Sequence, residues 1–199
     1  FPWFSRGQPV LWWSPDPRMV LNIARFKLHR SLRKSLCHLL ETQRLEIRLD
    51  HGFERVIHAC AHKPRAGQPG TWIVPDMIKA YGELHWAGHA HSVETWIDGK
   101  LAGGLYCVNL GRMMFGESMF AHQTDASKIA LVAFCSTHDI AMIDCQQNTQ
   151  HLASLGAAEI SREDFVAHLH KTVDLAAPAW HFDPLYFNEI LAPRAITTP

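Results

Sequence analysis

The stretch SVETWIDGKLAGGLYCV, residues 92–108, decides the fold of this chain of 199 residues. Val93 to Ile97 has the alternation of a strand, and Asp98-Gly99 is a dipeptide that two-residue hairpin turns favour. A second apolar strand follows the turn, so the stretch predicts a β-hairpin. Met113 to Phe115 would add a third strand.

The chain after the hairpin predicts further alternation of helices and strands. Residues 126–135 are apolar at helical spacing, AMIDCQ (141–146) has the composition of a buried strand, and 149–156 forms a short helix ended by Gly156. Ser161 would open another helix. The order β-β-β-α-β-α predicts an α+β layered domain.

The chain before the hairpin is divided by loops. Residues 1–18 are rich in proline around a short predicted strand, LWW (11–13), and residues 63–70 form a clear loop. Between them, Glu46 to Leu49 alternates like a strand and Phe53 to Ala61 is helical. We place a domain boundary at this loop, with a small domain at 1–62 and a larger one at 63–199.

Composition excludes several classes of protein. Acidic and basic residues both number 19, so there is no overall charge for binding a polyanion. Five scattered cysteines without a CxxC pair fit reduced thiols in the cytoplasm, and we find no apolar run long enough for a membrane span. The one basic cluster lies in RFKLHRSLRK, where Phe26, His29, Leu32 and Leu36 could share a helical face. It fits a solvated helix face and a nucleic-acid contact equally well, and its basic residues are Arg25, Lys27, Arg30, Arg33 and Lys34.

Three acidic or amide side chains stand in apolar surroundings. Glu117, in MMFGESMF (113–120), needs either an internal basic partner such as Arg112 or Lys128, or a cationic ligand. Period-two alternation puts Asp144 and Gln146 on one face of their strand, where they could orient or deprotonate an attacking amine. A satisfied buried aspartate is the competing interpretation.

Other candidate groups fit structural roles better. The spacing of His85, His89 and His91 resembles that of metal ligands, but Gly88 would interrupt a shared helix, so we predict no metal site. Ser118 lacks the GxSxG context of a nucleophile, and Cys145 fits a core position. Trp3 and Trp72, flanked by loop-forming residues, suit stacking on a planar ligand or plain core packing.

Several motifs together closely resemble one family, the bacterial leucyl/phenylalanyl-tRNA-protein transferases of the N-end rule pathway. The resemblance covers residues 1 to about 172 and is carried by FPWFSRGQPVLWWSPDPR, GTWIVPDMIKAYGELHWAGHAHSVETW, GGLY, FGESMF, ASKIALVAF, IDCQ and ASLGAAEI. It implies a GNAT-like acyltransferase domain behind a smaller N-terminal domain. The family's usual segment ahead of FPWF is absent, so we expect the small domain to be truncated.

The resemblance also implies an activity. Members transfer Leu, Phe or Met from aminoacyl-tRNA to proteins that begin with Arg or Lys and so mark them for degradation. An aminoacyl ester is already activated and an α-amine has a pKa of about 7.7 to 8.0, so no cofactor, metal or covalent nucleophile is needed. Positioning can supply much of the rate. We expect a cytoplasmic monomer.

By similarity, each candidate residue acquires a role. Asp144 and Gln146 would be the catalytic pair, Glu117 would face the N-terminus of the acceptor, and Trp3 and Trp72 would hold the terminal adenosine of the tRNA. The basic cluster would bind the tRNA backbone. The pocket for the aminoacyl side chain would be lined by Leu105, Met114, Leu131, Phe134 and Ile143.

Two other functions remain open from the residues alone. A GNAT-type acetyltransferase would use acetyl-CoA, but it normally needs a glycine-rich pyrophosphate loop that ESMFAHQTDASK lacks. A non-enzymatic tRNA-binding module would use RFKLHRSLRK and would bind RNA without turnover.

Overall fold

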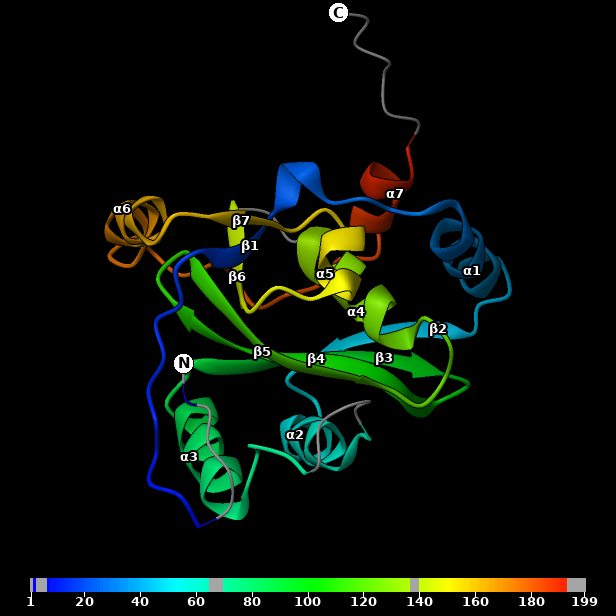
Figure 1. Cartoon of the computed structure of the whole chain (residues 1–199). Helices are drawn as coiled ribbons and strands as arrows, with labels where there is room; N and C mark the ends of the chain where they lie inside the picture. The colour runs from blue at the N-terminus through cyan, green and yellow to red at the C-terminus, as the bar shows by residue number, and fades with distance from the viewer. Residues whose placement is uncertain (1, 3–6, 65–69, 137–139, 193–199) are drawn as a thin grey trace, which may run out of the picture.

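The computed structural model describes residues 2, 7–64, 70–136 and 140–192 and is built around one mixed seven-stranded sheet. The order across the sheet is β2-β3-β4-β5-β6-β1-β7 (Figure 1). Only β5 and β6 pair in parallel; the other neighbours are antiparallel. In chain order the strands are β1 (Arg18–Asn22), β2 (Leu45–Leu49), β3 (Ala90–Ile97), β4 (Lys100–Leu110), β5 (Met113–Ala121), β6 (Met142–Gln146) and β7 (Ala158–Ile160).

The predicted hairpin is confirmed as β3 and β4. Asp98 and Gly99 have φ angles of 52° and 70°, the left-handed values that a two-residue hairpin turn requires. Arg44, just before β2, donates to both carboxylate oxygens of Asp98 at 2.8 and 2.5 Å. This contact ties the turn to the start of the strand that pairs with β3.

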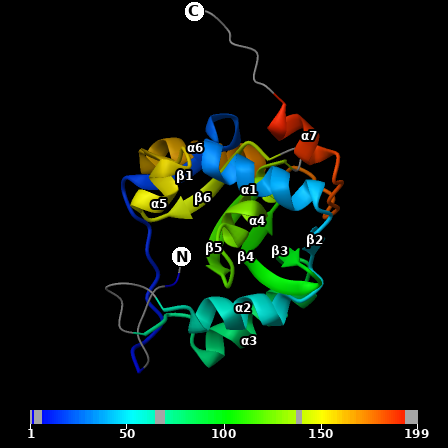
Figure 2. The ribbon, with the colours of Figure 1, turned by 90° about the vertical axis from the view of Figure 1, so that its right-hand side faces the viewer.

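Helices cover both faces of the sheet (Figures 1 and 2). On one face α4 (Ala126–Ser136), which is buried at nearly every position, packs with α1 (Arg30–Glu41) and α7 (Tyr186–Leu191) in the main core. On the other face α2 (Phe53–His62) and α3 (Pro75–Trp86) enclose a second core around Tyr81, Tyr106 and Phe120. The short helix α5 (Gln150–Ser154) and α6 (Arg162–Thr172) complete the fold, and Phe165 of α6 packs near β1 and β5.

The predicted elements after the hairpin agree with β5, α4, β6, α5 and α6, and the α+β class is confirmed. Two local predictions are wrong. LWW is not a strand, because Trp12 forms only an isolated bridge with Pro2. Phe26 and His29 precede α1, since a 3-10 turn at Ile23–Arg25 and an extended segment come first.

The proposed boundary at residue 62 lies between α2 and α3. Strands from both sides of it, β1 and β2 before and β3 to β7 after, pair within the same sheet. The division into a small and a large domain therefore stays a prediction.

Candidate active site

The candidate site lies where β5 and β6 run side by side in parallel. Their pairing is short, with Met114 opposite Ile143 and Phe115 opposite Asp144. Immediately beyond it, β5 carries a bulge: Tyr106 pairs with Ser118 and Cys107 with Gly116, so Glu117 is the extra residue. A bulge turns one side chain out of the regular alternation and often marks a functional site. The bulge therefore explains why an acid occupies an apolar strand.

Glu117 is held by a buried tyrosine. The Tyr81 hydroxyl, from α3, donates to Glu117 Oε2 at 2.9 Å. The pKa of Glu117 is raised from 4.5 to about 7: burial is the main cause and the Asp144 charge adds to it, while the Tyr81 hydrogen bond and the nearby Gln146 amide act to lower it. Of the two internal basic partners considered, Lys128 binds Asp125 at 2.9 Å, and Arg112 Nε donates to the Ala176 carbonyl at 3.4 Å.

Asp144 is fully buried and is bound on both carboxylate oxygens by one arginine. Arg18, the first residue of β1, donates from Nε to Oδ1 at 2.9 Å and from Nη2 to Oδ2 at 2.5 Å. The backbone N–H of Gln146 donates to Oδ1 at 2.8 Å. Asp144 is thus a satisfied buried aspartate as well as a neighbour of Glu117.

Gln146 ends β6 in an unusual conformation. Its φ is 65°, a left-handed value that is uncommon for a residue other than glycine. Its side chain lies close enough to Glu117 to lower that pKa. Yet its buried Nε2 makes no hydrogen bond of standard geometry with any residue that the structure describes. A buried amide donor of this kind is a ready contact for a ligand.

The five residues predicted for the aminoacyl pocket lie together. All belong to the main core cluster between the sheet and α4. Leu105 and Leu131 are each 5% exposed and Met114 is 0% exposed, so the five residues form packed core in this structure.

Of the two tryptophans predicted to hold the adenosine, the structure describes Trp72. Trp72 is partly buried beside the second core, and its ring meets Tyr81 edge to face with centroids 6.1 Å apart. It therefore lies one side chain away from Glu117. Trp3 lies outside the described residues.

The basic cluster is mostly exposed. Arg25, Lys27, Arg30 and Lys34 reach solvent, whereas Arg33 is half-buried and donates to the backbone carbonyls of Leu191 and, at 3.4 Å, Ile190. Helix α1 has no acidic residue in its first turn and no side-chain cap at its start. Cations at a helix N-terminus oppose the helix dipole, so this arrangement favours an anionic ligand.

The histidine cluster is occupied by structural contacts. His85 Nδ1 lies 2.8 Å from the Ala90 carbonyl, and His91 Nδ1 lies 2.7 Å from Asp50 Oδ2. Within the described ranges, no three His, Cys, Asp or Glu side chains are arranged to hold a metal ion. A separate cavity of about 330 Å³ lies between the end of α2 and the end of β5, where His58, His62, Lys63 and His122 line it.

All five cysteines are free, and burial raises the pKa of Cys145 to about 12, which keeps it a neutral thiol. No helix in the described part of the chain is long and apolar enough to cross a bilayer.

Sequence reasoning missed Arg18 and Tyr81. Arg18 opens the strand RMVLN, whose next three residues are apolar and buried, and a charge at the edge of a buried strand indicates a buried partner. Tyr81 carried no such signal, because a tyrosine on an amphipathic helix fits a core position equally well.

The fold and the site define an α+β protein in which the buried Asp144 and Gln146 meet the partly buried Glu117 at a parallel strand pair. A solved structure from Bacteroides thetaiotaomicron, described as a conserved protein of unknown function, shares the fold with a TM-score of 0.51 at 11% identity. The likeness covers 70% of this chain and 53% of that one, so this chain spans about half of its length.

Comparison with families and curated relatives identifies the family. The profile described as leucyl/phenylalanyl-tRNA protein transferase matches residues 20–170. A leucyl/phenylalanyl-tRNA--protein transferase from Polaromonas sp. is 69% identical over 100% of this chain and 79% of its own length. Those of Albidiferax ferrireducens and Leptothrix cholodnii are 58% and 62% identical, over 100% and 92% of this chain and 79% and 73% of their own lengths. The chain belongs to the leucyl/phenylalanyl-tRNA protein transferase family.

Proposed function

We propose that the chain is an aminoacyltransferase that moves Leu, Phe or Met from aminoacyl-tRNA to proteins beginning with Arg or Lys. The new peptide bond marks the acceptor for degradation. The observation that carries this proposal is 69% identity over the whole chain to a relative of that name. The site adds a chemical reason, because its carboxyl and amide groups suit the binding of an amine.

The acceptor would bind at Glu117 and Gln146. The Glu117 carboxyl lies in apolar surroundings, where an ionic contact with an arginine or lysine is strong. The unpartnered Gln146 Nε2 is a donor for a substrate carbonyl, such as that of the ester. Asp144 would complete the catalytic pair.

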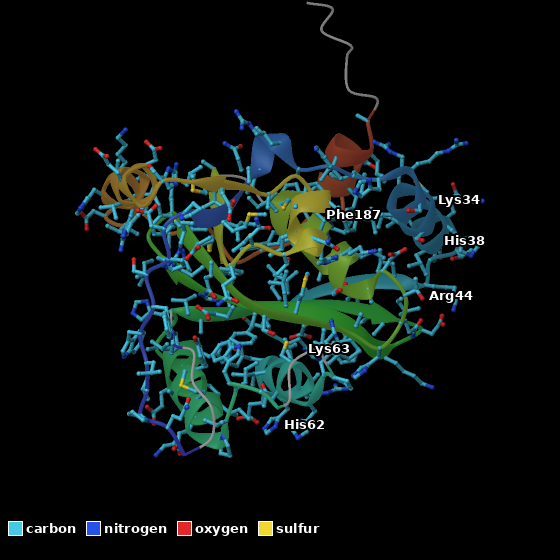
Figure 3. The ribbon with its side chains drawn as sticks, in the orientation of Figure 1. Lys34, His38, Arg44, His62, Lys63 and Phe187 are labelled. Carbon is cyan, nitrogen blue, oxygen red and sulfur yellow. The ribbon has the colours of Figure 1, made fainter. Side chains whose placement is uncertain are left out.

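The donor would bind on the neighbouring surfaces. Trp72 and Trp3 would stack on the terminal adenosine, and the aminoacyl side chain would bind against the apolar cluster that contains Leu105 and Leu131. The backbone of the tRNA would bind the exposed cations near the start of α1. Lys34 extends outward from α1 (Figure 3).

Several finer points belong to the same proposal. The order β3-β4-β5-α4-β6, with parallel β5 and β6 joined through α4, supports a GNAT-like catalytic domain at 63–199 behind a smaller domain at 1–62. Five free cysteines support the cytoplasm. We infer a monomer.

The test is to incubate the protein with Phe-tRNA and a short peptide that starts with Arg, and then to weigh the peptide. One added Phe on the Arg peptide, and none on an Ala-start peptide or an α-acetylated Arg peptide, would support the proposal. Asp144→Ala should transfer much less. Binding of tRNA without transfer would instead indicate a binding module, and an acetyl group gained from acetyl-CoA would indicate an acetyltransferase.

A further inference from the structure

Both oxygens of the buried Asp144 carboxylate are engaged by neighbouring donors. Oδ1 accepts from Arg18 Nε at 2.9 Å and from Gln146 N at 2.8 Å, and Oδ2 accepts from Arg18 Nη2 at 2.5 Å. A bidentate arginine fixes the plane of a carboxylate as well as its position. The geometry therefore suits Asp144 to hold its neighbours in place.

The neighbour that Asp144 holds is Gln146. A left-handed φ of 65° in a glutamine persists only where the surroundings enforce it. Asp144 Oδ1 supplies that constraint by accepting the Gln146 N–H. The backbone of Gln146 in turn sets where its side-chain amide lies beside Glu117.

Arg18 belongs to β1, and its guanidinium contacts residues of two other elements, β6 and α6. It opens β1, which lies between β6 and β7 in the sheet. Its guanidinium carbon lies 4.8 Å from the centre of the Phe165 ring on α6. The planar fork of an arginine matches a carboxylate in one orientation, and a lysine ammonium cannot reproduce this.

We propose that Arg18 is a positioning residue, which orients the Asp144 carboxylate so that it holds Gln146 in the conformation that meets the substrate. This inference rests on the proposed transfer reaction for its kinetic consequence. Its structural consequence, the ordering of Gln146, does not depend on that reaction.

The experiment compares Arg18→Lys and Arg18→Ala with wild type and with Arg44→Ala. Arg44 makes the same two contacts with Asp98, at 2.8 and 2.5 Å, but the side chains are 44% and 53% exposed. Arg44→Ala thus removes a bidentate arginine–carboxylate pair of the same geometry that lies away from the site. The measurements are hydrogen exchange of the Gln146 amide by NMR, and kcat and KM for Phe transfer to an Arg-start peptide.

In Arg18→Lys we expect the Gln146 amide to exchange at least tenfold faster, and kcat to fall at least tenfold with KM for Phe-tRNA changed less than threefold. Arg44→Ala should change neither. Millimolar guanidinium should restore part of the kcat of Arg18→Ala, because it can occupy the vacated site, and should not restore Asp144→Ala.

Unchanged Gln146 exchange in Arg18→Lys would overturn the proposal, whether or not the wild type transfers Phe. Faster exchange throughout β1 and β6 would also overturn it, because Arg18 would then be merely structural. If Arg18→Ala does not fold, Arg18→Lys decides. If the wild type shows no transfer, the proposed function is refuted. If the Gln146 amide still exchanges faster in Arg18→Lys than in that wild type, the positioning role stands.

Discussion

At the scale of single residues, the position of Glu117 in the fold determines the pKa of its carboxyl. Its carboxyl lies in a β-bulge beside Tyr81, Gln146 and Asp144, and burial is the main cause that brings its pKa to about 7. A carboxyl with such a pKa changes charge near neutral pH. Contact with a cationic acceptor would favour the charged form and lower the pKa again.

The raised pKa has a consequence for stability. Because the folded pKa is above the unfolded value, the native state binds the proton more tightly, and this stabilisation is fully present below pH 4.5 and is lost as pH rises to about 7. Glu117→Gln removes the titration. We expect the free energy of unfolding of wild type to fall, relative to the variant, by on the order of 2 kcal/mol across that window. Urea unfolding at several pH values measures it, and parallel curves would contradict it.

The same substitution separates stability from recognition. Gln keeps the shape of Glu117 and loses its charge, so we expect kcat/KM for an Arg-start peptide to fall at least tenfold. Binding of Phe-tRNA should be unchanged. The measurement is steady-state transfer with the tRNA saturating, and an equal loss of tRNA affinity would argue that Glu117 supports the fold and not the acceptor.

Among the elements, β4 and α4 approach each other closely at Gly103. A Cβ on Gly103 would lie 2.6 Å from Ala126 Cβ and 2.8 Å from the Ser127 nitrogen at the start of α4. The glycine is therefore needed for close approach, because it lets the central helix sit against the strand. This explains one of the two adjacent glycines in the middle of a predicted strand.

Gly103→Ala should therefore destabilise the protein, by about 1 to 3 kcal/mol, because α4 must move away from the sheet. The matched change is Gly82→Ala in α3, where a Cβ would meet nothing within 4 Å. It should stabilise the helix by about 0.5 to 1 kcal/mol. Thermal unfolding of both variants measures the difference, and equal effects of the two substitutions would refute the close-approach explanation.

At the scale of the whole molecule, charge is balanced overall and uneven locally. Acidic and basic residues both number 19, yet four exposed cations gather before and along the first half of α1. Lys34 and His38 extend from this helix on one side of the molecule (Figure 3). A local cationic surface on a neutral protein suits a limited number of phosphate contacts.

We expect the affinity for tRNA to fall steeply with salt. Arg30→Ala or Lys34→Ala should each weaken binding and reduce the slope of log affinity against log salt by about one. The control is Lys79→Ala on α3, a lysine 79% exposed that faces Glu83 at 4.0 Å. Filter binding from low to moderate salt measures the slopes. A flat response in wild type would refute a phosphate-binding role.

The sequence by itself determined the local features. Alternation and the Asp98-Gly99 turn predicted the hairpin, helical spacing predicted α4, and an apolar run ending in a carboxylate and an amide predicted β6. These predictions hold because turn geometry and the burial of one face act over a few neighbouring residues. The resemblance to the family also predicted roles for residues, such as those of the aminoacyl pocket, to which local sequence patterns assign no function.

Only the tertiary structure decided which residues complete the site. Arg18 and Asp144 are 126 positions apart, and Tyr81 and Glu117 are 36 apart, so their contacts follow from how β1 and α3 pack against the sheet. The place of β1 between β6 and β7 also lay beyond sequence reasoning, because strand pairing over such separations is set by the packing of the whole chain. The apolar surroundings of Glu117 were visible in the sequence, but its hydroxyl partner and its raised pKa required the folded molecule.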